Sequence, residues 1–343
     1  MKAFVVDAYG TEGPRAAEVP EPTVGRRDVL VRVSAASINP LDAMTRNGDF
    51  KRLIKRRTPF VLGHDVAGVV AAVGADVRDF TVGDEVYARP RDLRIGTFAE
   101  SIAIDEDDVA PKPSALTFEE AASVPLVALA AWQILVDRAD VKPGQKVLVH
   151  AGAGGLGSTV VQLARHLGAV VAATTSGSTA ELVTGLGADV VVDYTRQDFS
   201  TALSGYDLVV DSVGGQNLER SLTVLRPGGL AIGVAGPPDA GFAEQLGAPA
   251  VLRVAMRLLS RRIRRRATSL GVRYEFFFMH ASGSQLRELG ELYDAGVLRP
   301  VVDRTFPFEQ TSEAMAYVAQ GRTKAGKVVV TMAAPPEAGP PAD

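Results

Sequence analysis

The sequence predicts an α/β protein in which a small β-barrel domain precedes a doubly wound domain with a six-stranded parallel sheet. Short strands separated by turns fill most of residues 1–122, and six near-continuous apolar runs with helices between them follow. A glycine-rich turn joins the first of these runs to a helix, in the strand–turn–helix order of doubly wound domains. The length of 343 residues exceeds that of one ordinary core, so two domains are expected.

The barrel strands are identified by their alternating apolar residues. In the segment 29–34, Val29, Val31 and Val33 lie on one face. The other strands expected in this domain cover residues 2–9, 66–73, 85–88 and 97–104. Ala-rich helical stretches over residues 118–137 then mark the change to the second domain.

The strands of the second domain are expected to be parallel and buried on both faces, because their apolar runs are near-continuous rather than alternating. These runs cover residues 146–151, 170–175, 190–194, 208–213, 230–234 and 274–279. After a helix at 285–295, residues 301–331 return to strand, helix and strand, outside the completed sheet. We therefore expect domains at 1–122 with 297–335 and at 123–296, followed by a Pro-rich disordered tail at 336–343.

Composition excludes several classes of protein. Hydrophobic residues make up 46% and charged residues 22%, the balance of a soluble globular protein. Because no run of about 18 apolar residues occurs and the N-terminus starts on a strand pattern, we expect a cytoplasmic protein without membrane span or leader. The lack of Cys excludes disulfides, thiolate nucleophiles and Cys-based zinc sites. The net charge of −3 gives no general attraction to nucleic acid, so no nucleic-acid partner is expected.

A glycine motif at residues 152–157 indicates a dinucleotide site. It reads GxGxxG between a strand and a helix, and a second strand follows. The first glycine permits the tight turn, the second lets the backbone approach a pyrophosphate, and the third lets the helix pack on the strand. The loop residues expected to bind the cofactor are Gly152, Ala153, Gly154, Gly155, Leu156 and Gly157.

The residues after the second strand of this domain favour NADPH over NADH. An acid about 20 positions after the glycines would hold a ribose hydroxyl of NAD and repel a 2′-phosphate. The chain has a run of hydroxyl residues at 174–179 instead, from which we assign Thr175, Ser176 and Thr179 to the cofactor. The alternative is that these hydroxyls only cap the helix at 180–186.

With these motifs the sequence resembles the medium-chain dehydrogenase/reductase superfamily, in its zinc-independent quinone oxidoreductase branch. The resemblance implies a GroES-like β-barrel joined to a Rossmann domain, with the cofactor in the cleft between them and the chain returning to the barrel at its end. It also implies NADPH-dependent reduction of quinones or α,β-unsaturated carbonyls. The matching segments, in the family's order, are SINPLDAMTRNG, LGHDVAGVVAAVG, VGDEVYA, GTFAE, AAW, AGAGGLGSTVVQLA, LGADVVVDY, DLVVDSVGG and GKVVV.

Departures from the zinc-dependent members argue against a metal. Those members carry a Cys where Asn39 stands, and four clustered cysteines that this chain lacks. His64 and Asp65 form a GHD that resembles their GHE, but one His and one carboxylate leave a catalytic zinc short of a ligand. We expect His64 to be structural and the protein to hold no metal. Within the quinone reductase branch, Met44 stands where a Tyr is frequent, and the basic residue often found near Thr179 is missing.

Without a metal or a thiolate, the expected chemistry is hydride transfer to an acceptor that is already activated. A quinone or an enone fits, because conjugation delocalises the charge that arrives at oxygen. Asn39 and Asp42 are the expected catalytic residues, as polar groups beside the nicotinamide or the substrate oxygen. The alternatives are that Asn39 with the following Pro only opens a turn and that Asp42 only caps a helix through Arg46.

Four further residues are expected to contact the cofactor. Ser212 and Val213 end the fourth strand of the sheet, at the edge where ligands bind. Tyr194 matches the family position that flanks the adenine ribose, and Lys327 in GKVVV is expected to reach the cofactor across the cleft. A solvated lysine before an edge strand is the alternative for Lys327.

The leading prediction is therefore an enzyme, an NADPH-dependent quinone or enone reductase. One alternative is a cofactor-gated binding protein that acts at a membrane surface or on a partner through an Arg-rich segment. An alcohol dehydrogenase is the least supported alternative, because the zinc ligands are missing.

Two segments predict contacts outside the active site. The last sheet strand, YEFFFM, is expected to pair with its two-fold mate in a homodimer, unless a helix covers it. Residues 251–273 contain eight Arg and no acid and are expected to form one basic amphipathic helix. Its apolar stripe is expected to pack on its own domain. The alternatives are weak contact with an anionic membrane surface and an arginine that binds the 2′-phosphate.

Overall fold

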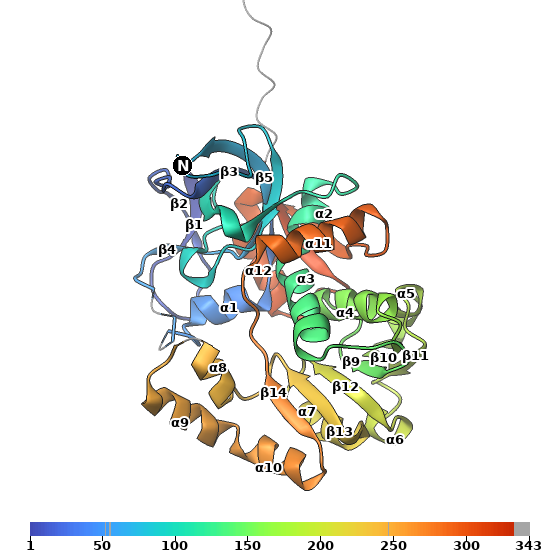
Figure 1. Cartoon of the computed structure of the whole chain (residues 1–343). Coiled ribbons are helices and arrows are strands. Elements are labelled where there is room, and N and C mark those ends of the chain that lie inside the picture. Colours follow the sequence, from blue (N-terminus) through green and yellow to red (C-terminus); the bar gives the residue numbers. More distant parts are fainter. Residues whose placement is uncertain (52, 55, 246, 333–343) are drawn as a thin grey trace, which may run out of the picture.

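The computed structural model describes residues 1–51, 53–54, 56–245 and 247–332 of the chain. A β-rich lobe formed mainly by the N-terminal part lies above a parallel sheet with helices around it (Figure 1). Strands near the C-terminus lie in the β-rich lobe, so the chain crosses between the lobes twice. The tail expected at 336–343 lies outside the described residues.

The β-rich lobe contains two sheets. A three-stranded sheet consists of β1 (Lys2–Val6), β2 (Arg15–Glu18) and β4 (Phe60–Val61). The larger one has seven strands, in the order β15-β16-β3-β5-β6-β8 with β7 also paired to β3. Its strands are β3 (Asp28–Ile38), β5 (Asp65–Val73), β6 (Glu85–Ala88), β7 (Ser101–Asp105), β8 (Val109–Pro111), β15 (Val302–Pro307) and β16 (Lys327–Thr331). The expected strands are present, although β1 ends earlier and β7 begins later than predicted.

The return of the chain end to this lobe is confirmed. Strand β16 pairs antiparallel with β3, and β15 pairs parallel with β16. Helix α12 (Thr311–Ala319) connects the two, as a parallel pair requires. The alternation of β3 places Val29, Val31 and Val33 in one buried cluster with Val328 and Val330 of β16.

The second sheet has the six parallel strands that the apolar runs predict. They are β9 (Lys146–Val149), β10 (Val170–Thr175), β11 (Val190–Asp193), β12 (Tyr206–Asp211), β13 (Leu225–Gly233) and β14 (Arg273–Phe276). Their order is β11-β10-β9-β12-β13-β14, so the chain reverses direction across the sheet between β9 and β12. Ligands bind at such a reversal, at the carboxyl ends of the strands.

Helices cover both faces of this sheet and connect it to the other lobe. Around the sheet lie α4 (Gly155–His166), α5 (Ala180–Gly185), α6 (Phe199–Ala202) and α7 (Gly215–Val224). The remaining α-helices are α1 (Pro40–Asn47), α2 (Phe118–Ala122), α3 (Pro125–Trp132), α8 (Ala240–Gln245), α9 (Ala250–Leu259), α10 (Arg261–Ser269) and α11 (Gly283–Asp294). Short 3₁₀ turns cover Asp92–Arg94, Glu106–Asp108, Gly177–Thr179 and Phe308–Gln310, and a π-helical turn covers Gln133–Arg138. Among the described residues, no helix has the length and apolar content needed to span a bilayer.

The Arg-rich segment departs from the prediction in two ways. It forms two helices instead of one, with the break at Ser260, which is buried and bonds the Met256 carbonyl through its hydroxyl. Ile263 and Ala267 of α10 pack on the core of the sheet, as expected. The expected packing is wrong for α9, whose Val251, Val254, Leu258 and Leu259 are 58–78% exposed. Helix α10 lies against β14, whereas α9 packs on α8 beyond the sheet edge and finds no apolar surface for this stripe.

Strand β14 is shorter than predicted and is the edge of the sheet. It covers only Arg273–Phe276 and pairs with β13 alone. The outward N–H of Phe276 donates to the Asp239 carboxylate at 3.1 Å, so part of this edge is satisfied within the chain. The Tyr274 hydroxyl donates to the Pro237 carbonyl on the same side.

Candidate active site

The glycine loop between β9 and α4 has the shape that a phosphate group requires. An added Cβ at Gly157 would lie 2.1 Å from the Ala151 carbonyl oxygen, so only glycine lets α4 start this close to the strand. At Gly152 an added Cβ would lie 2.8 Å from the Ala173 Cβ of β10. Gly154 is the N-cap of α4 and has no side chain to satisfy the first-turn amides. Those amides are therefore available to an anion, and the loop fits a dinucleotide.

The side chain of Lys327, which comes from the other lobe, leaves little room for a side chain at position 155. An added Cβ there would lie 2.7 Å from Cδ of Lys327, and the Gly326 N–H donates to the Ala153 carbonyl at 2.7 Å. Gly154 and Gly326 also form an isolated parallel bridge. The loop and the start of β16 are thus in direct contact, and Lys327 lies at the glycine loop, while its contact with the cofactor stays a prediction.

Lys327 is part of a buried polar network between the lobes. Its Nζ donates to Oδ1 of Asn39 and, at 3.2 Å, to Oδ2 of Asp65. The amide nitrogen of Asn39 donates to the same Asp65 oxygen at 2.8 Å. Lys327 is only 6% exposed, so the alternative of a solvated lysine is wrong. Its ammonium group has three hydrogens and uses two in this network, which leaves one for a ligand.

Asp65, which the sequence analysis considered only as a metal ligand, is the centre of this network. Its Oδ2 also accepts the Ser37 hydroxyl at 2.9 Å, and its Oδ1 accepts the N–H of Leu126 at 2.8 Å. Leu126 lies in the first turn of α3, where a carboxylate is favourable. The carboxylate is completely buried and is satisfied by Lys327 and these donors. Only the tertiary fold reveals this role, because the partners come from three separate segments.

Asn39 and Asp42 lie together at the start of α1. The Asn39 N–H donates to the Asp42 carboxylate at 2.6 Å, so Asp42 caps α1 through this N–H. The expected contact through Arg46 is not the one that forms, because the Arg46 guanidinium bonds the Asn47 side chain. The other Asp42 oxygen lies 2.6 Å from Nδ1 of His64. His64 is 1% exposed and satisfied by this contact, as expected for a structural residue. Both polar ends of the Asn39 side chain are already bonded within the chain.

The remaining predicted cofactor residues occupy the carboxyl ends of neighbouring strands. Ser212 and Val213 follow β12, and the Ser212 hydroxyl donates to the His150 carbonyl at 3.3 Å beside the loop. Val213 is 56% and Tyr194 is 61% exposed, so both have free surface. Tyr194 follows β11, one strand further from the loop than β10.

The hydroxyl groups that follow β10 hydrogen-bond to one another. The Thr175 and Thr179 hydroxyls lie 2.5 Å apart and are buried, and the Ser176 hydroxyl lies 3.0 Å from that of Ser178. The side chain of Thr179, the N-cap of α5, makes no capping bond, so the capping alternative is not observed for it. The Gly177 backbone lies against Asp193 at the end of β11, where Arg196 is 3.9 Å from the same carboxylate. Arg196, which the sequence analysis missed, places a cation beside this turn.

His150 lies under the loop but is not positioned for proton transfer. Its Nδ1 lies 3.0 Å from the Thr174 hydroxyl and its Nε2 lies 2.9 Å from the Ser221 hydroxyl. Burial lowers the pKa of His150 to about 4, against the opposing effect of Asp211. The imidazole is therefore neutral at pH 7 and holds β9 against β10 and α7.

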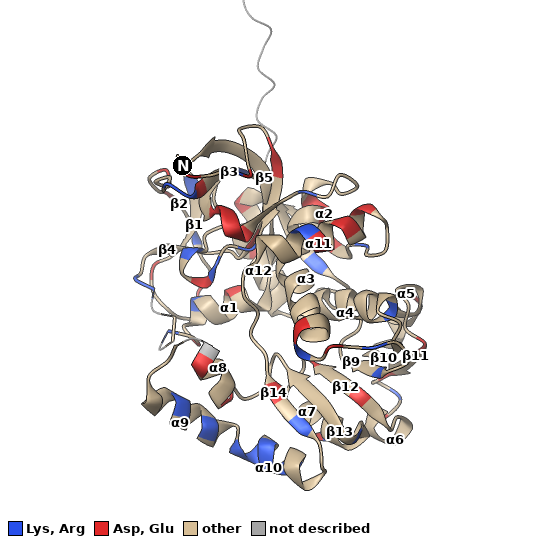
Figure 2. Cartoon of the chain, in the orientation of Figure 1, with Lys and Arg blue, Asp and Glu red and all other residues tan. Residues whose placement is uncertain are grey.

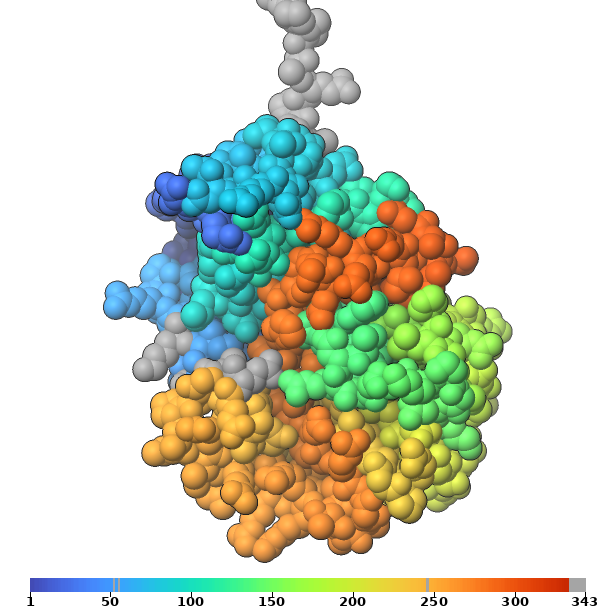
Figure 3. Space-filling model, viewed as in Figure 1, coloured from blue at the N-terminus to red at the C-terminus, as the bar shows by residue number. Residues whose placement is uncertain are grey.

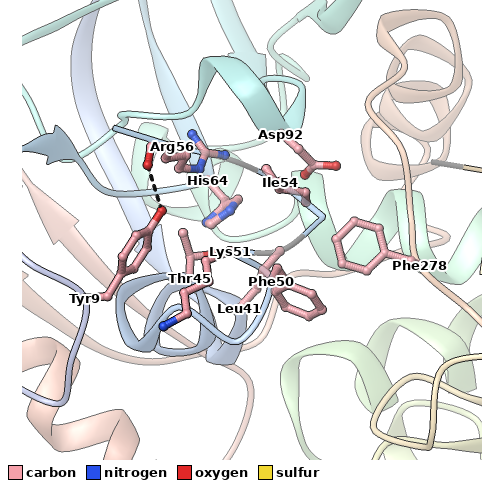
Figure 4. A pocket seen from close by; sticks show the side chains of 10 residues that line it. All are labelled: Tyr9, Leu41, Thr45, Phe50, Lys51, Ile54, Arg56, His64, Asp92 and Phe278. Carbon is pink, nitrogen blue, oxygen red and sulfur yellow. Dashed lines mark hydrogen bonds between the residues drawn. The ribbon is translucent and has the colours of Figure 1, made fainter. Parts of the chain in front are cut away.

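A pocket opens beside the polar network. It is lined by Tyr9, Leu41, Thr45, Phe50, Lys51, Ile54, Arg56, His64, Asp92 and Phe278 (Figure 4). Phe50 of the β-rich lobe and Phe278, which follows β14, have ring centres 5.5 Å apart. The two lobes thus both contribute to the wall. Leu41 and Thr45 are on α1, so the pocket adjoins Asn39 and Asp42.

Comparison with known proteins identifies similar chains along the full length. Residues 25–114 match the family model of an alcohol dehydrogenase GroES-like domain, and residues 186–330 match that of a zinc-binding dehydrogenase. The mitochondrial NAD(P)H oxidoreductase RTN4IP1 of Mus musculus is 34% identical over 97% of this chain and 89% of its own length. The chloroplastic NADPH-dependent alkenal/one oxidoreductase of Arabidopsis thaliana is 34% identical over 96% of this chain and 79% of its own. The solved quinone oxidoreductase from Coxiella burnetii superposes with a TM-score of 0.83 at 29% identity, covering 96% of this chain and 99% of that one.

One family description names zinc. In the part of the chain that the structure describes, no group of three or more His, Cys, Asp or Glu side chains is arranged to hold a metal ion. His64 and Asp65, the two residues that resemble zinc ligands in sequence, bond Asp42 and Lys327 respectively. That the protein holds no metal stays a prediction.

The glycine loop generates a test with a matched control. We expect Gly157→Ala to raise the Kd for NADPH by about tenfold or more, equivalent to about 1.4 kcal/mol, because the methyl group displaces the loop from α4. Gly185→Ala, at a helical position with open space around it, is expected to leave the Kd unchanged. Fluorescence titration measures both. Equal NADPH affinities for the two variants would contradict the assigned binding loop.

Proposed function

Because the chain belongs to the medium-chain dehydrogenase/reductase superfamily, we propose that it is an NADPH-dependent oxidoreductase that reduces a quinone or an α,β-unsaturated carbonyl without zinc. The observation that carries the proposal is the contact of the buried Lys327–Asn39–Asp65 network with the glycine loop. This network places polar side chains where the cofactor and the acceptor would meet. The described residues contain no group of side chains that could hold a metal ion. The relatives named above are all oxidoreductases, and none supports the binding-protein alternative.

The residues of this chain would bind and orient the reactants. Bound NADPH would supply the hydride. The amides of residues 154–157 would hold the pyrophosphate, and the third hydrogen of Lys327 would bond the cofactor near the cleft. Asn39 would orient Lys327, and Asp42 would position Asn39 through its N–H, so both act here as positioning residues. Solvent would provide the proton for the reduced product.

The preference for NADPH is proposed from the turn after β10. Ser178 is exposed and Ser176 is half-buried there, and Arg196 would offer a cation to the 2′-phosphate. Thr175 and Thr179 would shape the turn through their mutual hydrogen bond, while Tyr194, Ser212 and Val213 would line the adenosine and nicotinamide sides. An arginine from the Arg-rich helices is not needed to bind the 2′-phosphate, because Arg196 is already close to the turn through Asp193.

The activity is tested by following NADPH oxidation with a benzoquinone, an enone and a simple ketone. We expect turnover with the first two only, because a simple ketone needs a Lewis acid to stabilise the charge at its oxygen. We also expect kcat/KM to be higher with NADPH than with NADH. Reduction of the ketone alone, or a preference for NADH, would contradict the proposal.

We propose domain boundaries at 1–122 with 297–335 and at 123–296. The separation of the two sheets along the chain supports this division, and the last three residues of the first domain lie outside the described part.

We propose a homodimer in which β14 pairs with its two-fold mate. An open edge strand is a template for pairing, and β14 has no neighbour on its outer side among the described strands. The Asp239 carboxylate covers one of its outward N–H groups, so this pairing would have to displace or extend around that contact.

The dimer predicts a scattering mass of twice the 36.1 kDa chain. Light scattering behind size-exclusion chromatography over a concentration series measures it. A mass of one chain at micromolar concentration would rule the dimer out.

We propose weak contact of α9 and α10 with an anionic membrane surface. In Figure 2, helices α9 and α10 show the blue of basic residues and no red of acidic ones. The same helices form part of the outer surface of the molecule in Figure 3. The exposed Val251, Val254, Leu258 and Leu259 provide apolar groups beside the arginines. Two copies facing each other here would bring like charges together, so a lipid surface fits better than a second chain. The cytoplasmic location stays a prediction, and a cytoplasmic protein meets an anionic leaflet.

Vesicle co-sedimentation tests this contact. We expect binding to phosphatidylcholine vesicles that contain phosphatidylglycerol, reduced by high salt because the attraction is electrostatic. The double variant Arg264→Gln/Arg265→Gln is expected to weaken it, whereas Arg26→Gln/Arg287→Gln removes the same charge elsewhere and is not. Absence of binding at low salt, or indifference to salt, would exclude the electrostatic contact.

A further inference from the structure

The pocket between the lobes contains an arginine, Arg56, that forms no ion pair with any described residue. Arg56 is half-buried, and its guanidinium carbon lies 5.9 Å over the centre of the Phe60 ring. The Tyr9 hydroxyl donates to the Arg56 backbone carbonyl at 3.1 Å, which ties this segment to the barrel. Among the described residues, Asp92 is the acid that lines the pocket, and it forms its ion pair with Arg89. Arg56 has no ion pair within the part of the chain that the structure describes.

The surroundings of Arg56 compensate its charge only in part. Burial lowers the pKa of the guanidinium to about 10, and the attraction of Asp92 opposes this shift. The group is still charged at pH 7, so the pocket contains a cation that has lost hydration. Arg89, completely buried behind Asp92, has an Nε without a hydrogen-bond partner among the described residues. A desolvated cation in a cleft favours an anionic ligand, because an anion restores the lost stabilisation.

Arg56 lies at one end of the pocket and the aromatic walls lie at the other (Figure 4). Phe50 and Phe278 form those walls, one from each lobe. His64 lines the pocket between these ends and is bonded to Asp42, which holds the N-terminus of α1 at Asn39. Hydrogen bonds through His64, Asp42 and Asn39 therefore connect the wall of the pocket to the network that contains Lys327.

We propose that the acceptor reduced in this site carries a carboxylate, which Arg56 binds while the conjugated part of the acceptor lies beside Phe50 and Phe278. This inference rests on the proposed reductase function. A guanidinium offers two parallel N–H donors that match the two oxygens of a carboxylate. Lys51, exposed at the rim, adds attraction for an approaching anion.

The experiment compares one aromatic enone in two forms, 4-(3-oxobut-1-enyl)benzoate and its methyl ester. We expect the native protein with NADPH to show a kcat/KM about tenfold or more higher for the acid, the effect of one charge-assisted contact. Arg56→Gln is expected to bring the ratio of acid to ester to about one. Arg57→Gln removes the charge of the exposed neighbour and is expected to keep the native ratio. Arg56→Lys keeps the charge without the fork and is expected to give an intermediate ratio.

The affinity for NADPH reports whether each variant is folded. A second measurement tests the anion site without turnover: calorimetry compares how tightly the NADP⁺-loaded protein binds the saturated acid and the saturated ester. A native ratio near one, or a ratio that survives Arg56→Gln in a protein that binds NADPH, would overturn the carboxylate site and leave the reductase intact. Failure to reduce either enone or a quinone would overturn the reductase. In that case the calorimetric binding decides. If the saturated acid binds more tightly than its ester and Arg56→Gln abolishes this difference, the anion site is still supported. If the acid and the ester bind equally, the anion site is overturned.

Discussion

The contact on which the site depends is the buried ion pair between Lys327 and Asp65. An ammonium group without water is costly unless partners surround it. Asp65 and Asn39 supply them, from β5 and the N-cap of α1, while Asp65 also accepts the first-turn amide of α3. One lysine therefore connects the end of the chain, the barrel and the helix that leads to the parallel sheet. The same lysine side chain leaves little room for a side chain at position 155, so the glycine loop can pack directly against the start of β16.

Three pairs of opposite charges surround the cleft, whereas the half-buried Arg56 forms no ion pair among the described residues, and this difference bears on substrate choice. Lys327 faces Asp65, His64 faces Asp42, and Arg89 faces Asp92. Each of these pairs is bonded within the chain and organises the wall of the cleft. Among the described residues Arg56 forms no ion pair, the Phe60 ring lies beside its guanidinium, and the nearby Asp92 is paired with Arg89. A cleft that holds such a half-buried cation can discriminate acceptors by the group that pairs with it.

The fold was largely predictable because its local patterns agree with its long-range contacts. Six apolar runs became six parallel strands, and the glycine motif occupied the turn between β9 and α4. The Arg-rich segment was predicted less well. A periodic pattern over 251–269 does not reveal that Ser260 separates two helices or that α9 extends past the sheet edge. Helical periodicity specifies a face, whereas the surface available to cover that face is a property of the whole fold.

The sequence by itself determined the β-rich part, the six-stranded parallel sheet and the glycine turn before α4, and it indicated Asn39, Asp42 and Lys327 as candidates, because glycine spacing and strand periodicity are local properties. Only the tertiary structure decided which polar groups meet. The pairing of Asp65 with Lys327, the place of Arg196 beside the hydroxyl turn, and the place of Arg56 over the Phe60 ring all depend on how separate segments fold together. Burial and pairing of charges arise when separate strands and helices come together, and no local pattern in the chain records that arrangement.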